Sequence, residues 1–162
     1  MLELKKYLYI IYKRRYRTHQ RREYKLIERI PTAKELNKLR NLVGWGIIDE
    51  EALKIGLDHS LYGVCIAIDE NVIGTARIIG DRITCFYIQD VIVHPDYQRM
   101  GLGYSIMKKI MDYIDKTACS GAIVGLMSAK GKEEFYEKFG FWMRPNDHFG
   151  PGMMQFWEKE RS

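Results

Sequence analysis

The stretch HPDYQRMGLGYSIMKK, from His94 to Lys109, places two glycines two residues apart just before a helical pattern. Glycine weakens a helix, so Gly101 and Gly103 need an explanation. A helix N-terminus after a strand and a tight loop offers free backbone N–H groups and a favourable dipole to an anion. Glycines let a phosphate approach the backbone closely, and Arg99 adds a positive charge. The stretch therefore predicts a pyrophosphate-binding loop, although its spacing equally fits an ordinary loop with a glycine-softened helix start.

Two other phosphate-binding motifs do not fit this loop. The dinucleotide-binding fingerprint requires a third glycine at position 106, which is Ile106. A P-loop requires Gly-Lys-Ser/Thr, and none follows. The sequence therefore argues against both of these nucleotide-binding folds.

Hydrophobic periodicity on both sides of the loop predicts a mixed α/β architecture. Apolar runs bounded by turn residues predict strands at 24–30, 61–69, 72–79, 83–93, 121–127, 141–143 and 153–157. Helices are predicted from Thr32 to before Gly44, over 49–57, over 132–139, and after the loop, where apolar residues recur at Ile106, Met107, Ile110, Met111 and Ile114. Thr32 and Glu35 form a capping box, and Gly140 is placed as a left-handed C-cap. Strand 121–127 is expected to be buried.

Length and charge indicate one domain with a basic extension. The chain has 162 residues, of which 46% are hydrophobic and 29% charged, as in ordinary globular proteins. Residues 1–22 carry eight Lys/Arg and one acid, a net charge of +7, whereas the remainder carries eighteen basic and twenty acidic residues, a net charge of −2. We therefore expect a basic N-terminal extension, residues 1–22, and a single domain, residues 23–162.

The cysteines and the apolar segments point to a cytoplasmic protein without a metal. Cys65, Cys85 and Cys119 are scattered and form no CxxC or Cys/His spacing, which favours reduced thiols and argues against structural zinc. The apolar run 7–12 is too short to span a bilayer, and no small-residue cleavage site follows it. We expect no membrane span and no metal.

Two motifs resemble the GNAT superfamily of acetyl-CoA-dependent N-acetyltransferases. The family pattern Gln/Arg-x-x-Gly-x-Gly/Ala is present as Gln98, Gly101 and Gly103, after the strand-end element Val93-His94-Pro95. The family pattern Phe-Tyr-x-x-Phe/Leu-Gly-Phe is present as residues 135–141. Both motifs stand at the usual separation, so the resemblance is specific.

The resemblance covers about Tyr24 to Glu158 and implies a fold. That fold is α/β (α+β), with a mixed, mostly antiparallel sheet of about six to seven strands flanked by about four helices. Its central strands splay apart, and acetyl-CoA enters the gap. Dimers are common in the superfamily, so a homodimer is one arrangement that the resemblance allows.

The resemblance also implies where coenzyme A binds. Backbone groups of the strand end pair with the pantetheine arm, as an added strand pairs with a sheet edge. Backbone amides of the glycine loop bind the pyrophosphate. Ser128 and Lys132, after the fifth strand, are further candidates, although they equally fit a solvated surface segment. The expected cofactor-binding residues are Val91, Ile92, Val93, Gln98, Arg99, Met100, Gly101, Leu102, Gly103, Tyr104, Ser128 and Lys132.

The implied reaction is direct attack of a primary amine on the thioester in a ternary complex. An alkylamine has a pKa of about 10 and must lose a proton before it attacks, and the leaving thiolate must gain one. Tyr136 matches the family tyrosine that serves as general acid. Its alternative role is an aromatic side chain that packs a helix on the sheet.

The sequence does not decide which group serves as the general base. Asp90 is an acid in an otherwise apolar strand, so it is a candidate catalytic residue, or else a carboxylate held by the backbone or by Lys/Arg. Asp90 and Tyr87 fall on opposite faces of a regular strand, so a bulge decides which one faces the substrate. A chain of ordered water is a third route. We expect His94 to be exposed near the cofactor and not to serve as the base.

The acceptor is expected to be a small amine or a protein lysine. Trp45, Tyr87 and Phe149 are the predicted substrate-binding residues, because aromatic rings stack on arylalkylamines or wrap a lysine stem, although aromatic residues equally fit the core. The rival hypothesis is a non-catalytic protein that binds coenzyme A, or a protein that binds nucleic acid or an anionic surface through the basic extension. We do not expect nucleic acid as the partner.

Overall fold

The computed structural model describes residues 23–157, in two units, Met1–Leu126 and Met127–Ser162. The basic extension, residues 1–22, lies outside the described residues. The first unit contains, in chain order, β1 (Tyr24–Ile27), α2 (Ala33–Leu42), α3 (Glu50–Asp58), β2 (Tyr62–Ile68), β3 (Asn71–Gly80), β4 (Cys85–Val93), the 3₁₀ helix η1 (Pro95–Tyr97), α4 (Leu102–Thr117) and β5 (Ile123–Gly125). The second unit contains α5 (Glu133–Glu137).

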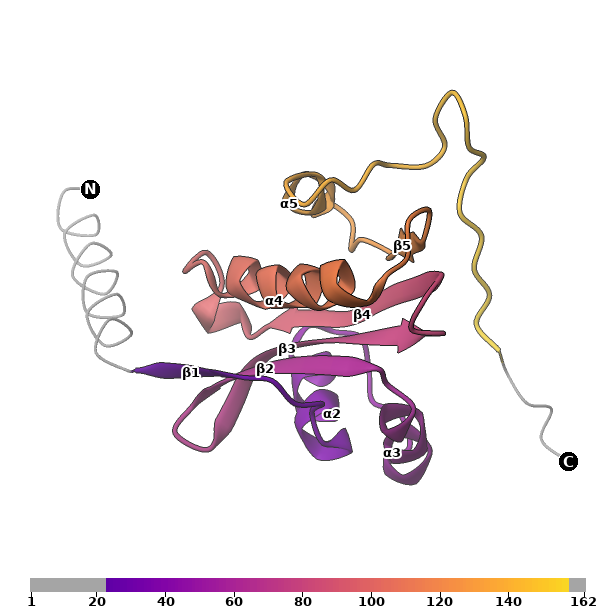
Figure 1. Cartoon of the computed structure of the whole chain (residues 1–162). Coiled ribbons are helices and arrows are strands. Elements are labelled where there is room, and N and C mark those ends of the chain that lie inside the picture. The colour runs from indigo at the N-terminus through magenta and orange to yellow at the C-terminus, as the bar shows by residue number, and fades with distance from the viewer. Residues whose placement is uncertain (1–22, 158–162) are drawn as a thin grey trace, which may run out of the picture. The chain divides into compact units, whose positions relative to one another are not determined.

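One five-stranded sheet organises the first unit, with strand order β1-β2-β3-β4-β5. Neighbouring strands are antiparallel from β1 to β4, and β5 is parallel to β4. Helix α4 covers one face of the sheet, and α2 and α3 cover the other (Figure 1). The predicted mixed, mostly antiparallel sheet is confirmed, and β2 and β3 form an antiparallel hairpin.

Local capping interactions begin α2 and α3 where the sequence predicts. The backbone N–H of Glu35 donates to Thr32 Oγ1 at 3.2 Å, and the Thr32 N–H donates to Glu35 Oε2 at 2.8 Å, which completes the capping box. Asp49 caps α3 by accepting from the Ala52 N–H at 2.9 Å. The N-terminal caps of α2 and α3 need only residues within three positions of each other, and the predicted helices are confirmed.

The α4 face of the sheet is apolar. Helix α4 buries Leu102, Ile106, Met107, Ile110 and Ile114, the spacing expected of one helical stripe. Gly74 lies beneath it, and a Cβ there would approach the Ile106 side chain to 3.1 Å, so only glycine lets the helix come this close. Because strand residues alternate, Ala76 and Ile78 share this face with Gly74.

The opposite face has its own core beneath α2 and α3. Its buried members are Ala33, Leu36, Leu39, Leu53, Leu57, Cys65, Val72 and Ile92. By the alternation of β3, Thr75 and Arg77 point to this face. A mostly shielded arginine, Arg77, therefore lies on one face of the sheet, while the other face at that strand is wholly apolar.

Two predictions about the last strands are wrong for the described residues. β5 has three residues rather than seven, and Ile123 is 70% exposed, because β5 is an edge strand that pairs only with Cys85, Phe86 and Tyr87. Segments 141–143 and 153–157 form no strand, since they are largely exposed and pair with no described strand. The described sheet therefore has five strands instead of six to seven.

Within residues 23–157 every helix is too short or too polar to cross a bilayer.

Candidate functional site

The glycine loop leads directly into the N-terminus of α4. Gly101 is the N-cap residue with φ +80°, and the first helical hydrogen bond runs from the Ser105 N–H to the Gly101 carbonyl at 3.0 Å. The first N–H groups of a helix have no partner within it. No side chain of the described residues caps this end of α4, and its first turn contains no acid. The positive end of the helix dipole is therefore not neutralised locally, as an anion site requires.

Two further features shape this loop. Arg99 also has a left-handed backbone, with φ +62°, and its side chain is exposed at the rim. Gln98 donates from Nε2 to the carbonyl of Val93 at 2.9 Å, which fastens the loop to the end of β4. A Cβ at Gly101 would meet no atom within 4 Å, so the space in front of the helix is open.

β4 has one open edge beside the loop. It pairs with β3 along its length, but β5 accompanies it only from Cys85 to Tyr87 and then ends at Gly125. Beyond Tyr87, none of the strands in the described part of the chain lies along that edge. The expected divergence of the central strands is therefore present, and it leaves an edge to which an extended ligand can add.

A β-bulge interrupts β4 at Asp90. Thr75 pairs with Ile92 and Arg77 pairs with Gln89, so β4 has one more residue than β3 between these pairs. Asp90 occupies the left-handed region at φ +54°, which aspartate tolerates better than most residues. The bulge turns the carboxylate of Asp90 to the α2 face, where Arg77 also lies. The open question of the strand geometry is thus answered, since Asp90 and Tyr87 share one face.

Two arginines hold the carboxylate of Asp90. Arg77 donates from Nε to Oδ2 at 2.7 Å, and Arg40, from the last turn of α2, donates from Nη1 to Oδ1 at 3.1 Å. Asp90 is 5% exposed. Of the interpretations given above, the contacts support a carboxylate held by arginine. Each oxygen accepts a charge-assisted hydrogen bond, so this carboxylate is better suited to fixing the bulge than to removing a proton.

The loop between α2 and α3 presents Trp45 at the surface. Gly44 and Gly46, on either side, have φ of +78° and +70°. Trp45 is 44% exposed and its ring lies 5.9 Å from the Arg40 guanidinium carbon. Arg40 also donates from Nη2 to the Trp45 carbonyl at 3.4 Å. Trp45 is therefore a surface side chain and not a core residue.

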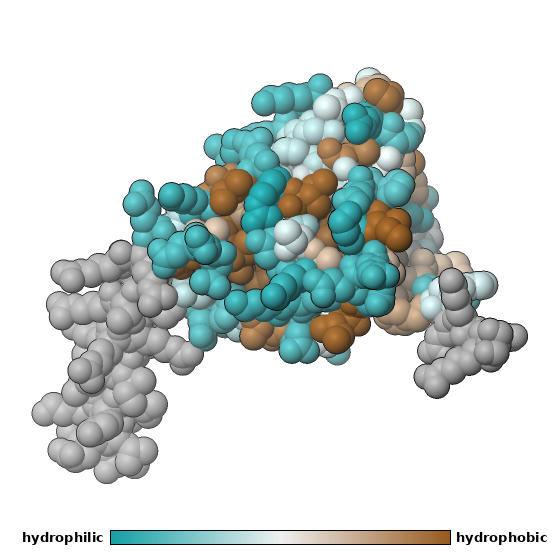
Figure 2. Space-filling model, turned by 90° about the horizontal axis from the view of Figure 1, so that it is seen from below, coloured by the Kyte–Doolittle hydropathy of each residue, from teal (hydrophilic) through white to brown (hydrophobic). Residues whose placement is uncertain are grey.

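Figure 2 shows the face formed by α2 and α3, where hydrophobic side chains interrupt a mostly hydrophilic surface. The exposed apolar residues of these helices and their loop are Leu42, Trp45, Ile47, Ile48 and Ile55. Four of the five belong to the segment 42–48. The surface next to the Asp90 network is therefore suited to an apolar part of a ligand.

In the second unit, Tyr136 is buried in an aromatic cluster. Its ring lies 5.0 Å from that of Phe135 and 6.3 Å from that of Phe141, both edge-on. The chain reverses at Gly140, with φ +84°, which confirms the predicted left-handed cap and brings Phe141 to Tyr136. Burial raises the pKa of Tyr136 to about 12. Its hydroxyl therefore keeps its proton throughout the neutral range.

Comparison with known proteins identifies the family. The sequence model described as the acetyltransferase (GNAT) family matches residues 12–141. The chain belongs to the GNAT acetyltransferase family. Enzymes of this family use acetyl-CoA, and the uncapped start of α4 beside the open edge of β4 fits that cofactor.

Relatives of this GNAT chain include two named acetyltransferases. An uncharacterized N-acetyltransferase ycf52-like protein of Prochlorococcus marinus is 33% identical over 117 residues, which cover 68% of this chain and 63% of the relative. The GCN5-related N-acetyltransferase 1, chloroplastic, of Arabidopsis thaliana is 28% identical over 131 residues, covering 79% of this chain and 64% of the relative. The chain thus spans less than two thirds of their lengths. Since the Arabidopsis protein is named chloroplastic, the cytoplasmic location stays a prediction.

A solved structure supports the GNAT assignment over a larger share of the fold. The crystal structure of a probable acetyltransferase of unknown function from meticillin-resistant Staphylococcus aureus has a TM-score of 0.75 and 31% identity. The match covers 83% of this chain and 100% of that one. The chain therefore shares its fold with a structure described as a probable acetyltransferase, and the predicted fold class is confirmed.

The remaining predicted GNAT site residues lie in the second unit. Ser128 donates from Oγ to the Ala129 carbonyl at 3.0 Å. Lys132 is exposed and occupies the N-cap position of α5. Phe149 is half-exposed, closes a turn by donating to Asn146 Oδ1 at 3.0 Å, and lies 5.4 Å from the Arg144 guanidinium carbon. Their roles toward cofactor and acceptor stay predictions.

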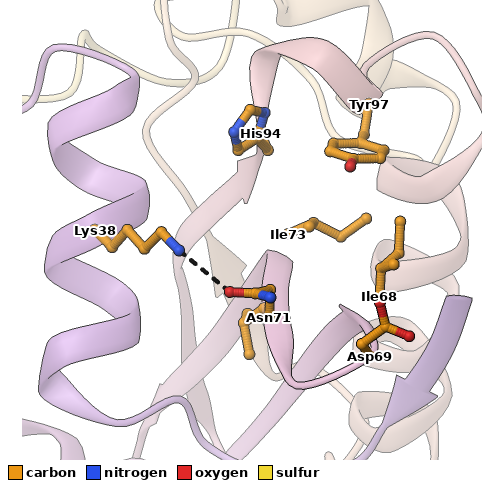
Figure 3. A pocket seen from close by; sticks show the side chains of 8 residues that line it. Lys38, Ile68, Asp69, Asn71, Ile73, His94 and Tyr97 are labelled. Atoms are coloured by element: carbon orange, nitrogen blue, oxygen red, sulfur yellow. Dashed lines mark hydrogen bonds between the residues drawn. The ribbon is translucent and has the colours of Figure 1, made fainter. Parts of the chain in front are cut away.

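A separate pocket lies next to η1 in the first unit. It has a volume of about 200 Å³ and is lined by Lys38, Ile68, Asp69, Asn71, Val72, Ile73, His94 and Tyr97 (Figure 3). His94 is half-buried here rather than exposed as expected, because its Nδ1 accepts from the Asp96 N–H at 3.2 Å. Lys38 Nζ donates to Asn71 Oδ1 at 3.4 Å.

In the described residues no group of three or more His, Cys, Asp or Glu could hold a metal.

Arg40 and Arg77 are site residues that the sequence analysis missed. A signal for Arg77 was present, since an arginine in the apolar strand VIGTARII and an aspartate in the apolar strand YIQDVIV are opposite charges in adjacent buried strands. Buried charges pair, so these two strands predict an ion pair. Arg40 gave no such signal, because it lies 50 positions from Asp90 on an amphipathic helix.

Proposed function

We propose that this chain is an N-acetyltransferase that moves an acetyl group from acetyl-CoA to a primary amine, either a small amine or a lysine side chain. The observation that carries the proposal is the uncapped, acid-free N-terminus of α4 next to the open edge of β4. A helix N-terminus attracts phosphate, and a free strand edge attracts an extended amide chain. Acetyl-CoA carries both groups.

The cofactor would be held by backbone groups. Amides of residues 99–104 would bind the pyrophosphate, with Gly101 permitting the left-handed turn and Arg99 adding positive charge. Backbone groups of Val91 to Val93 would pair with the pantetheine arm. Gln98 contributes indirectly, because its bond to the Val93 carbonyl keeps the loop and the strand end together. When bound, acetyl-CoA supplies an activated thioester.

The chain would then supply orientation and a proton. The amine nitrogen forms a bond to the acetyl carbon as the carbon–sulfur bond breaks, and the thiolate that leaves takes a proton. Holding both reactants in line supplies much of the acceleration. Tyr136 is the proposed donor of that proton because it matches the family tyrosine and carries a proton at neutral pH. Burial raises its pKa to about 12, so a hydrogen bond to the developing thiolate would have to assist the transfer.

Asp90 would act by holding the bulge of β4. Both of its oxygens already accept hydrogen bonds from arginine, so the proton of the attacking amine would leave through ordered water. In the first unit, the acceptor would lie against Trp45 and Tyr87 on the α2 face. Phe149, in the second unit, is a further proposed substrate-binding residue. A homodimer is compatible with this proposal but is not needed for it.

Acetyl transfer can be measured directly. Purified protein is incubated with acetyl-CoA and a panel of phenethylamine, spermidine and a lysine-containing peptide, and the thiol of released coenzyme A and the acetylated product are both quantified. We expect turnover of at least one amine, and a fall in kcat of about 100-fold in Tyr136→Phe, the size usual for loss of a general acid. Binding of acetyl-CoA should be unchanged in this variant.

Two results would contradict the proposal. Cofactor binding without transfer to any amine would favour the non-catalytic protein that binds coenzyme A. Equal kcat values for the intact protein and Tyr136→Phe would remove Tyr136 from the mechanism and leave it as a packing residue.

A further inference from the structure

The Asp90 network joins three segments that are far apart in sequence. Asp90 belongs to the bulge of β4, Arg40 to the last turn of α2, and Arg77 to β3, from where its Nη1 also donates to Ser60 Oγ at 3.2 Å. Arg40 and Arg77 have 16% and 12% of their side chains exposed, and Asp90 has 2%. The ion pairs are therefore mostly shielded from water and from salt.

Arg40 has a second set of contacts that Arg77 lacks. Its Nη2 donates to the Trp45 carbonyl, and its guanidinium carbon lies 5.9 Å from the Trp45 ring. One planar group therefore touches both the bulge of β4 and the loop between α2 and α3. Arginine suits this position because its fixed fork of donors reaches two acceptors while its face meets an aromatic ring.

The position of Arg40 leaves one donor unsatisfied. Arg40 Nε is buried and has no hydrogen-bond partner among the described residues. An unpaired buried donor is unfavourable, and such groups are rare in folded proteins. The observed orientation satisfies Asp90 and the Trp45 carbonyl together.

The loop needs such a support. Gly44 and Gly46 flank Trp45 with left-handed backbones, and Trp45, Ile47 and Ile48 are exposed, so few buried contacts hold this segment. Other bonds tie the loop only to α2: the Trp45 N–H donates to the Arg40 carbonyl at 2.9 Å, and the Asn37 side chain exchanges two hydrogen bonds with the backbone of Ile48, at 2.7 and 3.0 Å. The Arg40 guanidinium is the group that links Trp45 to the bulge of β4.

We propose that Arg40 is a positioning residue that aligns the Trp45 loop with the bulge of β4, and thereby sets the affinity for the amine acceptor and its preference for amines with an apolar part. This inference rests on the proposed function, because it assigns the acceptor to the α2 face. Arg40 is expected to affect binding of the acceptor and not binding of the cofactor. Loss of Arg40 loosens the acceptor surface, whereas the cofactor surfaces, the start of α4 and the edge of β4, keep their own contacts.

The test compares Arg40→Met with Arg40→Lys and with Arg29→Met as a matched control. Arg29 also pairs with an acid near α2, at 2.7 Å from Glu35, but it touches neither the bulge nor the loop. In a background with Trp142→Phe and Trp157→Phe, Trp45 is the single tryptophan, and its quenching by acrylamide reports exposure of the loop. Hydrogen exchange of residues 43–48 is measured alongside.

Arg40→Met is expected to raise the quenching constant of Trp45 at least two-fold and to speed exchange of residues 43–48. It should raise KM for phenethylamine, or for whichever panel amine the intact protein acetylates, by five-fold or more, with Kd for acetyl-CoA changed less than two-fold. Arg40→Lys, which keeps the charge but not the fork, should fall in between and carries the test if Arg40→Met does not fold. Arg29→Met should match the parent in all four readouts.

Unchanged quenching and exchange in a folded Arg40→Met protein would overturn the inference. So would an increase of similar size in Arg29→Met, because the effect would then be general loosening of α2. Failure of the proposed function would give a result that can be distinguished from failure of this inference. The intact protein would acetylate no amine, while the fluorescence and exchange measurements would still decide whether Arg40 holds the loop.

Discussion

The two faces of the sheet differ in what they contain and in what they do. Beneath α4 the contacts are apolar, from Ile78 on β3 to Ile110 on α4, and no charged side chain from the described helices or strands is buried there. Beneath α2 the core is interrupted by Asp90 and its two arginines. Apolar packing stabilises the fold without specifying a ligand, whereas a buried charge network is tolerated where it fixes geometry. The α2 face is thus the one whose geometry is fixed by a charge network, and it is the face to which we assign the acceptor in our proposal.

The largest expected effect on the free energy of unfolding comes from a substitution in the apolar core beneath α4. Phe86 is a buried strand residue whose ring is almost fully removed from water. Phe86→Ala should lower the free energy of unfolding by about 4 kcal/mol, because it removes apolar surface and leaves a cavity. Chemical denaturation measures this loss. Acetyl-CoA binding by the folded fraction should stay the same, and a loss of binding without loss of stability would contradict the separation of the faces.

Asp90→Asn tests the charge network beneath α2, and its expected effect on the free energy of unfolding is smaller. Asparagine is nearly isosteric and tolerates the left-handed backbone of the bulge, so only the charge is removed. Arg40 and Arg77 would then lie close together, mostly buried, without a counter-charge. We expect a loss of about 3 kcal/mol in the free energy of unfolding, measured by denaturation at neutral pH.

A control distinguishes the charge network from the bulge itself. Asp90→Ala removes the charge and also places a residue with a Cβ and no polar group in the left-handed region. It should therefore be less stable than Asp90→Asn by about 1 kcal/mol. Equal stability of the parent and Asp90→Asn would mean that the ion pairs contribute nothing to holding β4.

The smallest effect concerns Glu35, at the start of α2. The hydrogen bonds from the Arg29 guanidinium lower the pKa of Glu35 below its ordinary value of 4.5. A carboxyl with a lowered pKa in the folded state stabilises the protein above the unfolded-state pKa, and this contribution is lost as pH falls through the folded-state pKa. Glu35→Gln should therefore lose up to about 1 kcal/mol at pH 7 and approach the parent stability only as the pH falls below 4.5 and through the lowered folded-state pKa of Glu35.

The matched control for Glu35 is an exposed ion pair. Lys54 and Asp58 form an i,i+4 bridge on α3 at 2.8 Å, with both side chains mostly in water. Lys54→Ala should change the free energy of unfolding by less than about 0.5 kcal/mol at any pH between 4 and 8. A loss as large as that of Glu35→Gln would show that the capping box adds nothing to the bridge from Arg29.

Sequence analysis predicted the features that depend on near neighbours. The capping box at Thr32, the helical stripe of α4 and the left-handed Gly140 each need only a few adjacent residues, and each is confirmed. The glycine loop was located because a strand, a loop and a helix follow one another in the chain. Family and fold class followed from the motif at Gln98 and the motif at Phe135.

The features that were missed depend on tertiary arrangement. Whether segment 121–127 is buried depends on its being the edge strand, which its composition does not reveal. Segments 141–143 and 153–157 have strand-like residues but pair with no described strand. The partners of Asp90 lie 13 and 50 positions away, and the bulge that aims its carboxylate is visible only in the register of β3 and β4.

The most direct test of the central claim is calorimetric titration of acetyl-CoA into the intact protein and into Gly101→Glu. A Cβ at position 101 meets no atom within 4 Å, although the left-handed backbone (φ +80°) strains any side chain there. Glutamate also places a negative charge in front of α4, where the pyrophosphate is expected. We expect saturable binding by the intact protein and at least a 100-fold weaker affinity in Gly101→Glu, with a smaller loss in Gly101→Ala, which shares the strain of the left-handed backbone but adds no charge. Equal affinities for the intact protein and Gly101→Glu, or no binding by the intact protein at millimolar acetyl-CoA, would contradict the central claim.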